Sequence, residues 1–209
     1  MNFQDEKYLP FGNLKVLKDE KLTAGKKNLS FIEEFIDVVI IPLSGSLTYN
    51  DSLSNKAVIE KNQIGLFSVQ EGMAYELVNA SEKEDADYLQ VWLKSDGKLF
   101  TRQNRQKELN MSKGNCLLPV FTSKSSNTTD LKINTDASGF IGVYDKGKFE
   151  RYSLKNPGNG LYVFVIDGIF KFQDRLVESK GSISLVGNSA IEFELISNKG
   201  SFLLLEVPL

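Results

Sequence analysis

The chain contains no histidine, so it lacks the side chain that most often acts as a metal ligand or general base. Its single cysteine, Cys116, lies in the segment GNCLLP. A cysteine nucleophile needs a nearby base or positive charge to lower its pKa. We therefore interpret Cys116 as a small buried hydrophobic residue. One cysteine cannot form an intrachain disulfide and offers no thiolate cluster for a metal.

Acidic side chains are the remaining candidates for chemistry. Five of them lie in two stretches of the chain: Glu33, Glu34, Asp37, Glu71 and Glu76. Carboxylate oxygens suit Mg²⁺, Ca²⁺ or Mn²⁺ better than redox iron. Strand alternation, however, places Glu34 on the face opposite Glu33. We therefore expect most of these acids at solvated edges or in loops.

Short β-strands are the elements expected to position these residues. Residues 38–54, VVIIPLSGSLTYNDSLS, combine an apolar run, a Ser-Gly step, an alternating stretch and a polar cluster. This order predicts a β-hairpin. Hydrophobic residues make up 41% of the 209 residues, and fourteen Phe with seven Tyr favour strands in a globular protein.

The hairpin pattern occurs twice, in IIPLSGSLTYND and again in VFVIDGIFKFQD. In each copy a glycine ends an apolar run, apolar or aromatic residues follow two and four positions later, and an acid follows at six. These residues are Gly45, Leu47, Tyr49 and Asp51 in the first copy and Gly168, Phe170, Phe172 and Asp174 in the second. The duplication predicts two β-sandwich or β-barrel domains. We place them at 1–118 and 119–209, since 97–115 and 122–130 are polar, loop-like segments.

Charge and hydropathy exclude some classes of partner. The net charge is −2 and no basic stripe could neutralise a run of phosphates, so no nucleic-acid partner is expected. The first residues, MNFQDEKYLP, have neither a basic region nor an apolar core of a signal peptide, and no segment has the length of a membrane span. We expect a cytoplasmic protein that does not bind membranes.

At the level of motifs the chain resembles the bicupins of the pirin family, which includes proteins similar to quercetin dioxygenases. The resemblance is carried by FGNLKVLKDEKLTAGKKNLSFIEEFIDVVIIPLSGSLTYNDSLSN, IEKNQIGLFSVQEGMAYELVNAS, DYLQVWL and SGFIGVYDKGKFERYSLKNPGNGLYVFVIDGIFKF. It covers most of the chain from about Phe11. It implies an all-β, RmlC-like bicupin fold with two double-stranded β-helix (cupin, jelly-roll-like) barrels in tandem.

The resemblance also implies where a metal would bind. Metal-binding members use a His-x-His pair and then a His and a carboxylate two residues apart. In this chain these positions are Phe31 and Glu33, then Tyr75 and Leu77, and only Glu33 could ligate readily. We therefore expect no metal, no cofactor and no quercetinase-type dioxygenase activity.

The same positions define a candidate pocket. Its expected members are Phe31, Glu33, Tyr49, Tyr75, Leu77, Gln90 and Trp92. If Phe31, Tyr75 and Leu77 surround Glu33, burial raises the pKa of its carboxyl, and Glu33 with Tyr75 could act in acid–base catalysis. The alternative is a purely structural carboxyl, and Trp92 is expected to belong to the core.

Two functions are consistent with these residues. The leading hypothesis is a metal-free, pirin-like bicupin that binds a small apolar or carboxylated ligand or a protein partner. The alternative is an enzyme, either cofactor-independent through Glu33 and Tyr75 or dependent on an oxygen-ligated divalent metal. The sequence leaves ligand identity and oligomeric state open.

Overall fold

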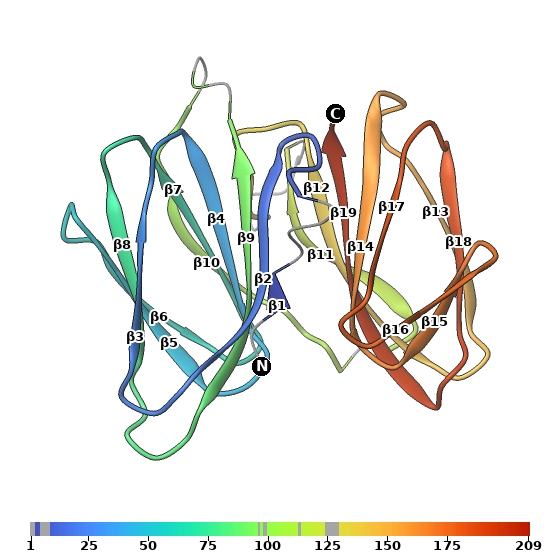
Figure 1. The fold of residues 1–209 in the computed structure, drawn as a ribbon, viewed down its shortest axis with the longest axis horizontal. Helices are drawn as coiled ribbons and strands as arrows, with labels where there is room; N and C mark the ends of the chain where they lie inside the picture. The colour runs from blue at the N-terminus through green and yellow to red at the C-terminus, as the bar shows by residue number, and fades with distance from the viewer. Residues whose placement is uncertain (1–2, 5–8, 96, 98–99, 113, 124–129) are drawn as a thin grey trace. The chain divides into compact units, whose positions relative to one another are not determined.

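Antiparallel β-strands make up the regular structure of the chain, seen here in a computed structural model (Figure 1). The structure describes all residues except 1–2, 5–8, 96, 98–99, 113 and 124–129. The chain divides into two compact units, residues 1–109 and 110–209. Each unit contains two sheets, so the predicted all-β cupin architecture is confirmed.

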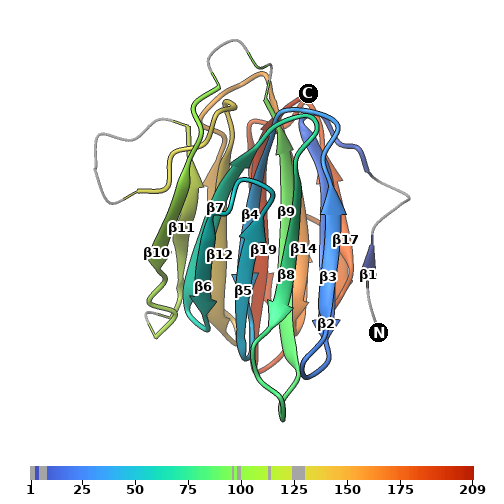
Figure 2. The same cartoon turned by 90° about the vertical axis from the view of Figure 1, so that its left-hand side faces the viewer.

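The N-terminal unit has a six-stranded and a four-stranded sheet. In spatial order, the larger sheet contains β1 (Phe3–Gln4), β2 (Leu14–Leu22), β9 (Ala86–Lys94), β4 (Ile36–Pro42), β7 (Gln63–Val69) and β10 (Asn104–Glu108). The smaller sheet contains β3 (Lys27–Phe31), β8 (Ala74–Asn79), β5 (Ser46–Asp51) and β6 (Lys56–Glu60), which lie side by side in Figure 2. The apolar face of each sheet turns toward the other, and the core lies between them.

The C-terminal unit repeats this plan. One sheet contains β11 (Cys116–Thr122), β12 (Ser138–Asp145), β19 (Lys199–Pro208), β14 (Asn159–Asp167) and β17 (Ser182–Leu185). The other contains β13 (Phe149–Ser153), β18 (Ala190–Leu195), β15 (Ile169–Phe172) and β16 (Arg175–Glu178). Its core is rich in aromatic rings, and the Phe202 ring contacts those of Phe170, Phe172 and Phe193.

The two glycines of the repeat occupy equivalent corners of the two units. Gly45 and Gly168 have φ angles of 67° and 92°, a conformation that favours glycine. A Cβ atom on Gly168 would lie 2.8 Å from the backbone oxygen of Lys199. The repeat detected in the sequence is therefore a structural duplication, and each glycine allows a strand to turn from one sheet into the other.

The division between the units falls after Leu109, nearer the N-terminus than the expected boundary at residue 118. That boundary would cut β11. Residues of β11 pair with β12 of the C-terminal unit along most of their length, for example Leu118 with Ile141. The whole strand therefore belongs to the second unit. Only the strand pairing, and no feature of the sequence, shows this.

No helix in the described part of the chain has the length and apolar character needed to cross a membrane.

Candidate functional site

A buried hydroxyl organises the interior of the N-terminal unit. Tyr75, on β8, is 1% exposed. Its hydroxyl oxygen accepts hydrogen bonds from Gln90 Nε2 at 2.6 Å and from Trp92 Nε1 at 2.8 Å, both from β9. Ser30, opposite Tyr75 on β3, also hydrogen-bonds to it. Burial raises the pKa of Tyr75 above its usual range, and the bonds from Ser30, Trp92 and Gln90 only partly offset this, so the phenol stays protonated.

Aromatic and aliphatic side chains fill the space around this hydroxyl. The Tyr49 ring stacks on Phe67, with centroids 3.7 Å apart and planes 7° from parallel. Tyr49 also stacks on Tyr75 at 5.4 Å. Tyr49 and Leu77 are each 1% exposed. Four of the predicted pocket residues, Tyr49, Tyr75, Leu77 and Gln90, are therefore packed inside the barrel rather than around an open cavity.

The expectation that Phe31 and Glu33 face the barrel interior is wrong. Phe31 is 72% exposed and Glu33 is exposed, whereas Ile32 between them is 3% exposed. The ladder explains the difference. Ser30 lies opposite the inward-facing Tyr75, and residues directly opposite in a sheet share a face. The family motif places its inward-facing residues at Phe31 and Glu33, one residue away from the positions that face inward in this strand. A shift of one residue turns each side chain to the other face of the sheet.

The residues present do not fit the metal centre that the family resemblance implies. Two of its four positions, Phe31 and Glu33, lie outside the barrel, Leu77 is a hydrocarbon, and the Tyr75 phenol stays protonated. The amide oxygen of Gln90 is buried without a hydrogen-bond partner, but a single amide oxygen is not a metal site. Among the described residues no three His, Cys, Asp or Glu side chains lie close enough to share an ion.

The five acids considered from the sequence also do not converge. Asp37 is buried on the side of β4 away from the core and accepts a 2.6 Å hydrogen bond from Ser68. Glu76 lies on the outer face of β8, where a hydrogen bond from Lys27 lowers its pKa. Glu34 forms an ion pair with Lys94. Four of the five acids are exposed or half-buried, in line with the expectation of solvated edges or loops, whereas Asp37 is buried in a strand.

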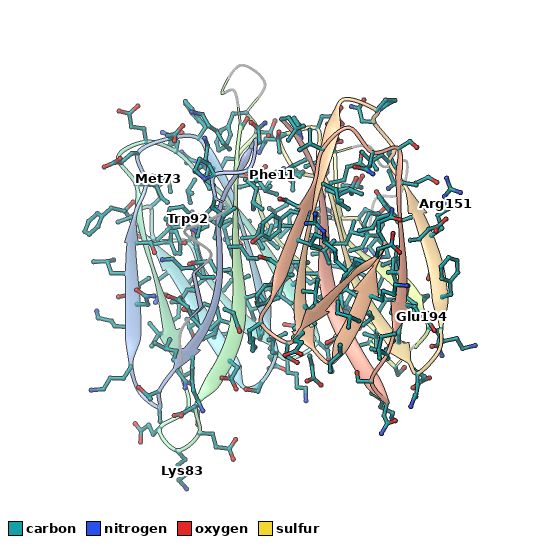
Figure 3. The ribbon with its side chains drawn as sticks, turned by 45° about the vertical axis from the view of Figure 1, so that its right-hand side comes forward. Phe11, Met73, Lys83, Trp92, Arg151 and Glu194 are labelled. Carbon is teal, nitrogen blue, oxygen red and sulfur yellow. The ribbon has the colours of Figure 1, made fainter. Side chains whose placement is uncertain are left out.

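A groove lies at the end of the barrel where β3 ends. Its volume is about 170 Å³, and five of its eight lining residues are apolar. The lining consists of Lys15, Val16, Phe31, Ile32, Glu33, Glu34, Ile36 and Trp92. Trp92 lies in the interior of the N-terminal unit, near the end marked by Met73 (Figure 3). Its half-buried ring separates the groove from the buried Tyr75 hydroxyl, to which its N–H is bonded.

Five groove residues were not among those predicted from the sequence: Lys15, Val16, Ile32, Glu34 and Ile36. Lys15 lies at a β-bulge, because the pairing of β2 with β9 shifts between Leu14 and Val16. Bulges redirect side chains and are frequent near functional sites. No residue type in residues 15–22, KVLKDEKL, predicts that bulge. For Ile32 the sequence did offer a signal, because an apolar residue between Phe31 and Glu33 is itself a candidate for an inward-facing position.

The C-terminal unit holds a buried carboxylate at the position equivalent to Trp92. Trp92 pairs with Val38, and Glu206 pairs with Leu161. Val38 and Leu161 are equivalent because each lies the same number of residues before the glycine of its unit, Gly45 or Gly168. Glu206 is 1% exposed. It accepts hydrogen bonds from the Tyr152 hydroxyl at 2.6 Å, the backbone N–H groups of residues 155 and 156 at 2.9 and 2.8 Å, and the Asn159 side chain at 3.1 Å. Its oxygens are fully used in holding residues 155–159 in place.

A larger cavity of about 540 Å³ lies in the C-terminal unit, at the ends of β12 and β19. Its walls are mainly polar, and the Asp145 carboxylate there already accepts a 2.9 Å hydrogen bond from Asn115. Sites for small organic ligands are mostly apolar with a few polar groups. The smaller groove over Trp92 matches that description better, and we take it as the candidate functional site.

Comparison with known proteins relates the chain to cupins. Residues 120–207 match the family described as the quercetinase C-terminal cupin domain. Quercetin 2,3-dioxygenase of Escherichia coli K12 is 22% identical over 135 residues, which are 65% of this chain and 57% of that protein. The pirin-like protein YhaK of the same strain is 24% identical over 156 residues, 75% of this chain and 65% of YhaK. Each match spans less than two thirds of the relative's length.

The fold is shared along the entire chain. The crystal structure of YhaK from Escherichia coli superposes with a TM-score of 0.86 at 21% identity, covering 100% of this chain and 93% of YhaK. At this identity the likeness establishes the fold, whereas the chemistry depends on the residues of the site.

Proposed function

Starting from a pirin-like bicupin whose residues 120–207 match the quercetinase C-terminal cupin family, we propose that this protein binds a small ligand in the groove over Trp92 and does not use a metal. The observation that carries the proposal is the groove itself. It combines an aromatic floor, aliphatic walls and charged side chains at one barrel end.

The residues at the positions that the family uses for its metal support the metal-free part of the proposal. The four positions of the family's metal ligands provide two hydrocarbons, a neutral phenol and one exposed carboxylate. A centre for oxygen activation needs neutral nitrogen donors together with open coordination positions. A dioxygenase reaction like that named for the Escherichia coli relative is therefore not expected here.

The geometry does not favour the alternative of acid–base catalysis by Glu33 and Tyr75. Glu33 is exposed and is not enclosed by Phe31, Tyr75 and Leu77. Tyr75 meets the edge of the Trp92 ring and does not line the groove, and its hydroxyl accepts hydrogen bonds from two side chains of β9. A substrate in the groove would meet the indole before the phenol.

Trp92 provides a direct test because it is the only tryptophan of the chain. Titration with benzyl alcohol, a neutral aromatic probe that fits a small cavity, should change Trp92 fluorescence saturably. A ligand of this size reaches about millimolar to micromolar affinity at best. Val16→Phe, which fills the groove from β2, should abolish the response, whereas Val58→Phe on the exposed face of β6 should not. A response that survives Val16→Phe would place the ligand elsewhere.

Metal content tests the second part of the proposal. After expression in medium supplemented with iron, nickel or copper, the purified protein should contain far less than one equivalent of metal. It should also leave quercetin unoxidised when the same metals are added. Stoichiometric metal or measurable turnover would overturn the metal-free proposal.

Association through the outer face of β3 is a second candidate function. Leu29 and Phe31 are 53% and 72% exposed there, on an edge strand of the four-stranded sheet. Exposed apolar edge strands tend to pair with another copy. Sedimentation equilibrium should then detect a dimer that Phe31→Ser converts to a monomer. A monomeric wild-type protein would remove this candidate.

A cytoplasmic location without nucleic-acid partners completes the proposal. The single cysteine and the net charge of −2 support it.

A further inference from the structure

Two side chains in the groove carry charges that no other described residue neutralises. Among the described residues, Lys15 has no ion pair or hydrogen bond from its ammonium group, although it is half-buried. Glu33 likewise has no partner for its carboxylate within the described part of the chain, whereas its neighbour Glu34 is paired with Lys94. Within the described part of the chain, the groove thus presents one positive and one negative charge without an ion-pair partner.

The two charges come from different sheets. The bulge beside Val16 places Lys15 in the groove from β2, a strand of the six-stranded sheet. Glu33 follows the end of β3, which belongs to the four-stranded sheet. They do not form an ion pair with each other, so a ligand between them could contact both. A half-buried ammonium gains most from a partner that also excludes water.

An apolar surface lies beside these charges. Trp92 forms the floor, with Ile32 and Ile36 buried next to it. The indole N–H is already bonded to Tyr75, and the Lys18 ammonium lies over the ring at 5.8 Å from its centroid, so Trp92 contributes apolar ring surface to the groove rather than a donor. A cavity of about 150 Å³ can hold benzene, so 170 Å³ accommodates an apolar group of similar size and no large ligand.

We propose that the groove binds a small zwitterion with an apolar side chain, that is, a free α-amino acid of the leucine or phenylalanine type. The Lys15 ammonium binds the carboxylate, the Glu33 carboxylate binds the amino group, and the side chain lies on Trp92. This rests on the proposed function and adds the ligand's chemical class to it. A ligand with only a carboxylate would place a second negative charge near Glu33 and leave Glu33 without a partner. A ligand with only an amine would likewise place a positive charge near Lys15 and leave Lys15 without a partner.

Three probes that share one ring test the assignment through Trp92 fluorescence: L-phenylalanine, 3-phenylpropanoate and 2-phenylethylamine. L-Phenylalanine should bind roughly three- to tenfold more tightly than either analogue, the range typical of one partly exposed ion pair. In Glu33→Gln the preference over 3-phenylpropanoate should disappear, and in Lys15→Met the preference over 2-phenylethylamine. Glu60→Gln and Lys61→Met, which change exposed residues outside the groove, serve as matched controls and should leave both preferences intact.

The outcomes separate this inference from the function on which it rests. If benzyl alcohol binds in the groove but the three charged probes bind equally, the zwitterion assignment is overturned and small-ligand binding stands. If no probe, including benzyl alcohol, changes Trp92 fluorescence, both fail. Lys15→Met and Glu33→Gln alter a half-buried and an exposed side chain that make no polar contact with other described residues, so unchanged thermal unfolding should show that both variants fold.

Discussion

The indole N–H of Trp92 donates a 2.8 Å hydrogen bond to the hydroxyl oxygen of Tyr75, across the two sheets of the N-terminal unit. Trp92 comes from β9 of the larger sheet and Tyr75 from β8 of the smaller one. The bond holds the ring that forms the groove floor. The same hydroxyl accepts a second hydrogen bond, from the buried Gln90, so one oxygen accepts from two side chains of β9.

Replacing Tyr75 with Phe should destabilise the protein by about 2–4 kcal/mol, because the buried Gln90 amide and the half-buried Trp92 indole lose their acceptor. Chemical denaturation followed by Trp92 fluorescence measures the change in free energy of unfolding. Tyr49→Phe is the matched control. The Tyr49 hydroxyl donates a longer hydrogen bond to Asp51, at 3.3 Å, so its loss should cost less than about 1 kcal/mol. Equal effects of the two substitutions would show that the Trp92–Tyr75 bond contributes little.

Gln90→Leu should leave stability within about 1 kcal/mol of the wild type. The variant loses the bond to Tyr75 but also removes an amide oxygen that is buried without a partner. The duplication supports this expectation, since Leu204 occupies the equivalent position of β19. Gln90→Ala, which leaves a cavity, should be clearly less stable in the same denaturation assay. A large loss for Gln90→Leu would indicate that the amide oxygen has a role that the leucine cannot replace.

Glu206→Gln should cost about 2–3 kcal/mol, since an amide nitrogen would face donors that now bond to a carboxylate oxygen. Thermal unfolding of the full chain measures this loss. Glu178→Gln, at an exposed position of β16, should change stability by less than about 0.5 kcal/mol. Similar values for both variants would contradict the role of Glu206 in holding residues 155–159.

Gly168→Ala should destabilise the protein by about 2 kcal/mol or more. The positive φ alone costs a residue with a Cβ about 1–2 kcal/mol, and here the new atom would also approach the backbone at 2.8 Å. Gly147→Ala separates the two effects, because its φ is 71° but a Cβ added there would meet no described atom within 4 Å beyond its chain neighbours. Its cost should be about 1 kcal/mol. The difference between the two denaturation midpoints isolates the steric part.

Alkaline pH should unfold the protein cooperatively. Burial raises the pKa of five tyrosines: Tyr49, Tyr75, Tyr88, Tyr144 and Tyr152. In the unfolded chain these phenols ionise near their ordinary pKa of about 10, so the unfolded state binds fewer protons above that pH. Stability is therefore constant below about pH 10 with respect to these groups and falls as the pH rises further. Phenolate absorbance of these five residues and circular dichroism should change together, and formation of more than two of the seven possible phenolates in the folded protein would contradict this.

The duplicated fold was predictable because it depends on local patterns. Gly45 and Gly168 with their alternating apolar neighbours mark the same corner in both units, and Leu47, Tyr49, Phe170 and Phe172 are all buried. The acids at the end of the pattern differ, however. Asp51 accepts hydrogen bonds from the backbone N–H groups of residues 53 and 55, whereas the side chain of Asp174 is fully exposed. The acid therefore stabilises a turn in the first unit, whereas the acid at the equivalent sequence position of the second unit extends into solvent.

The candidate site was predictable only in part. Trp92 does line the groove, together with Phe31 and Glu33, but the latter two do so from outside the barrel. Phe31 and Glu33 were wrongly placed inside the barrel because the sequence does not show which residues of β3 face inward. That choice depends on the register in which β3 pairs with β8. Lys15 was missed because a bulge in β2 arises from a mismatch between two strands that are distant in the sequence.

By itself the sequence determined the two all-β domains, the interior positions of their alternating strands and the absence of histidine, since each of these is a local or compositional property. Tertiary structure alone decided that Ile32 rather than Phe31 faces inward, that Tyr75 bonds to Trp92, and that Lys15 and Glu33 line one groove. The physical reason is that strand register, bulges and pairing join residues far apart in the chain, and one residue of slip exchanges the two faces of a strand.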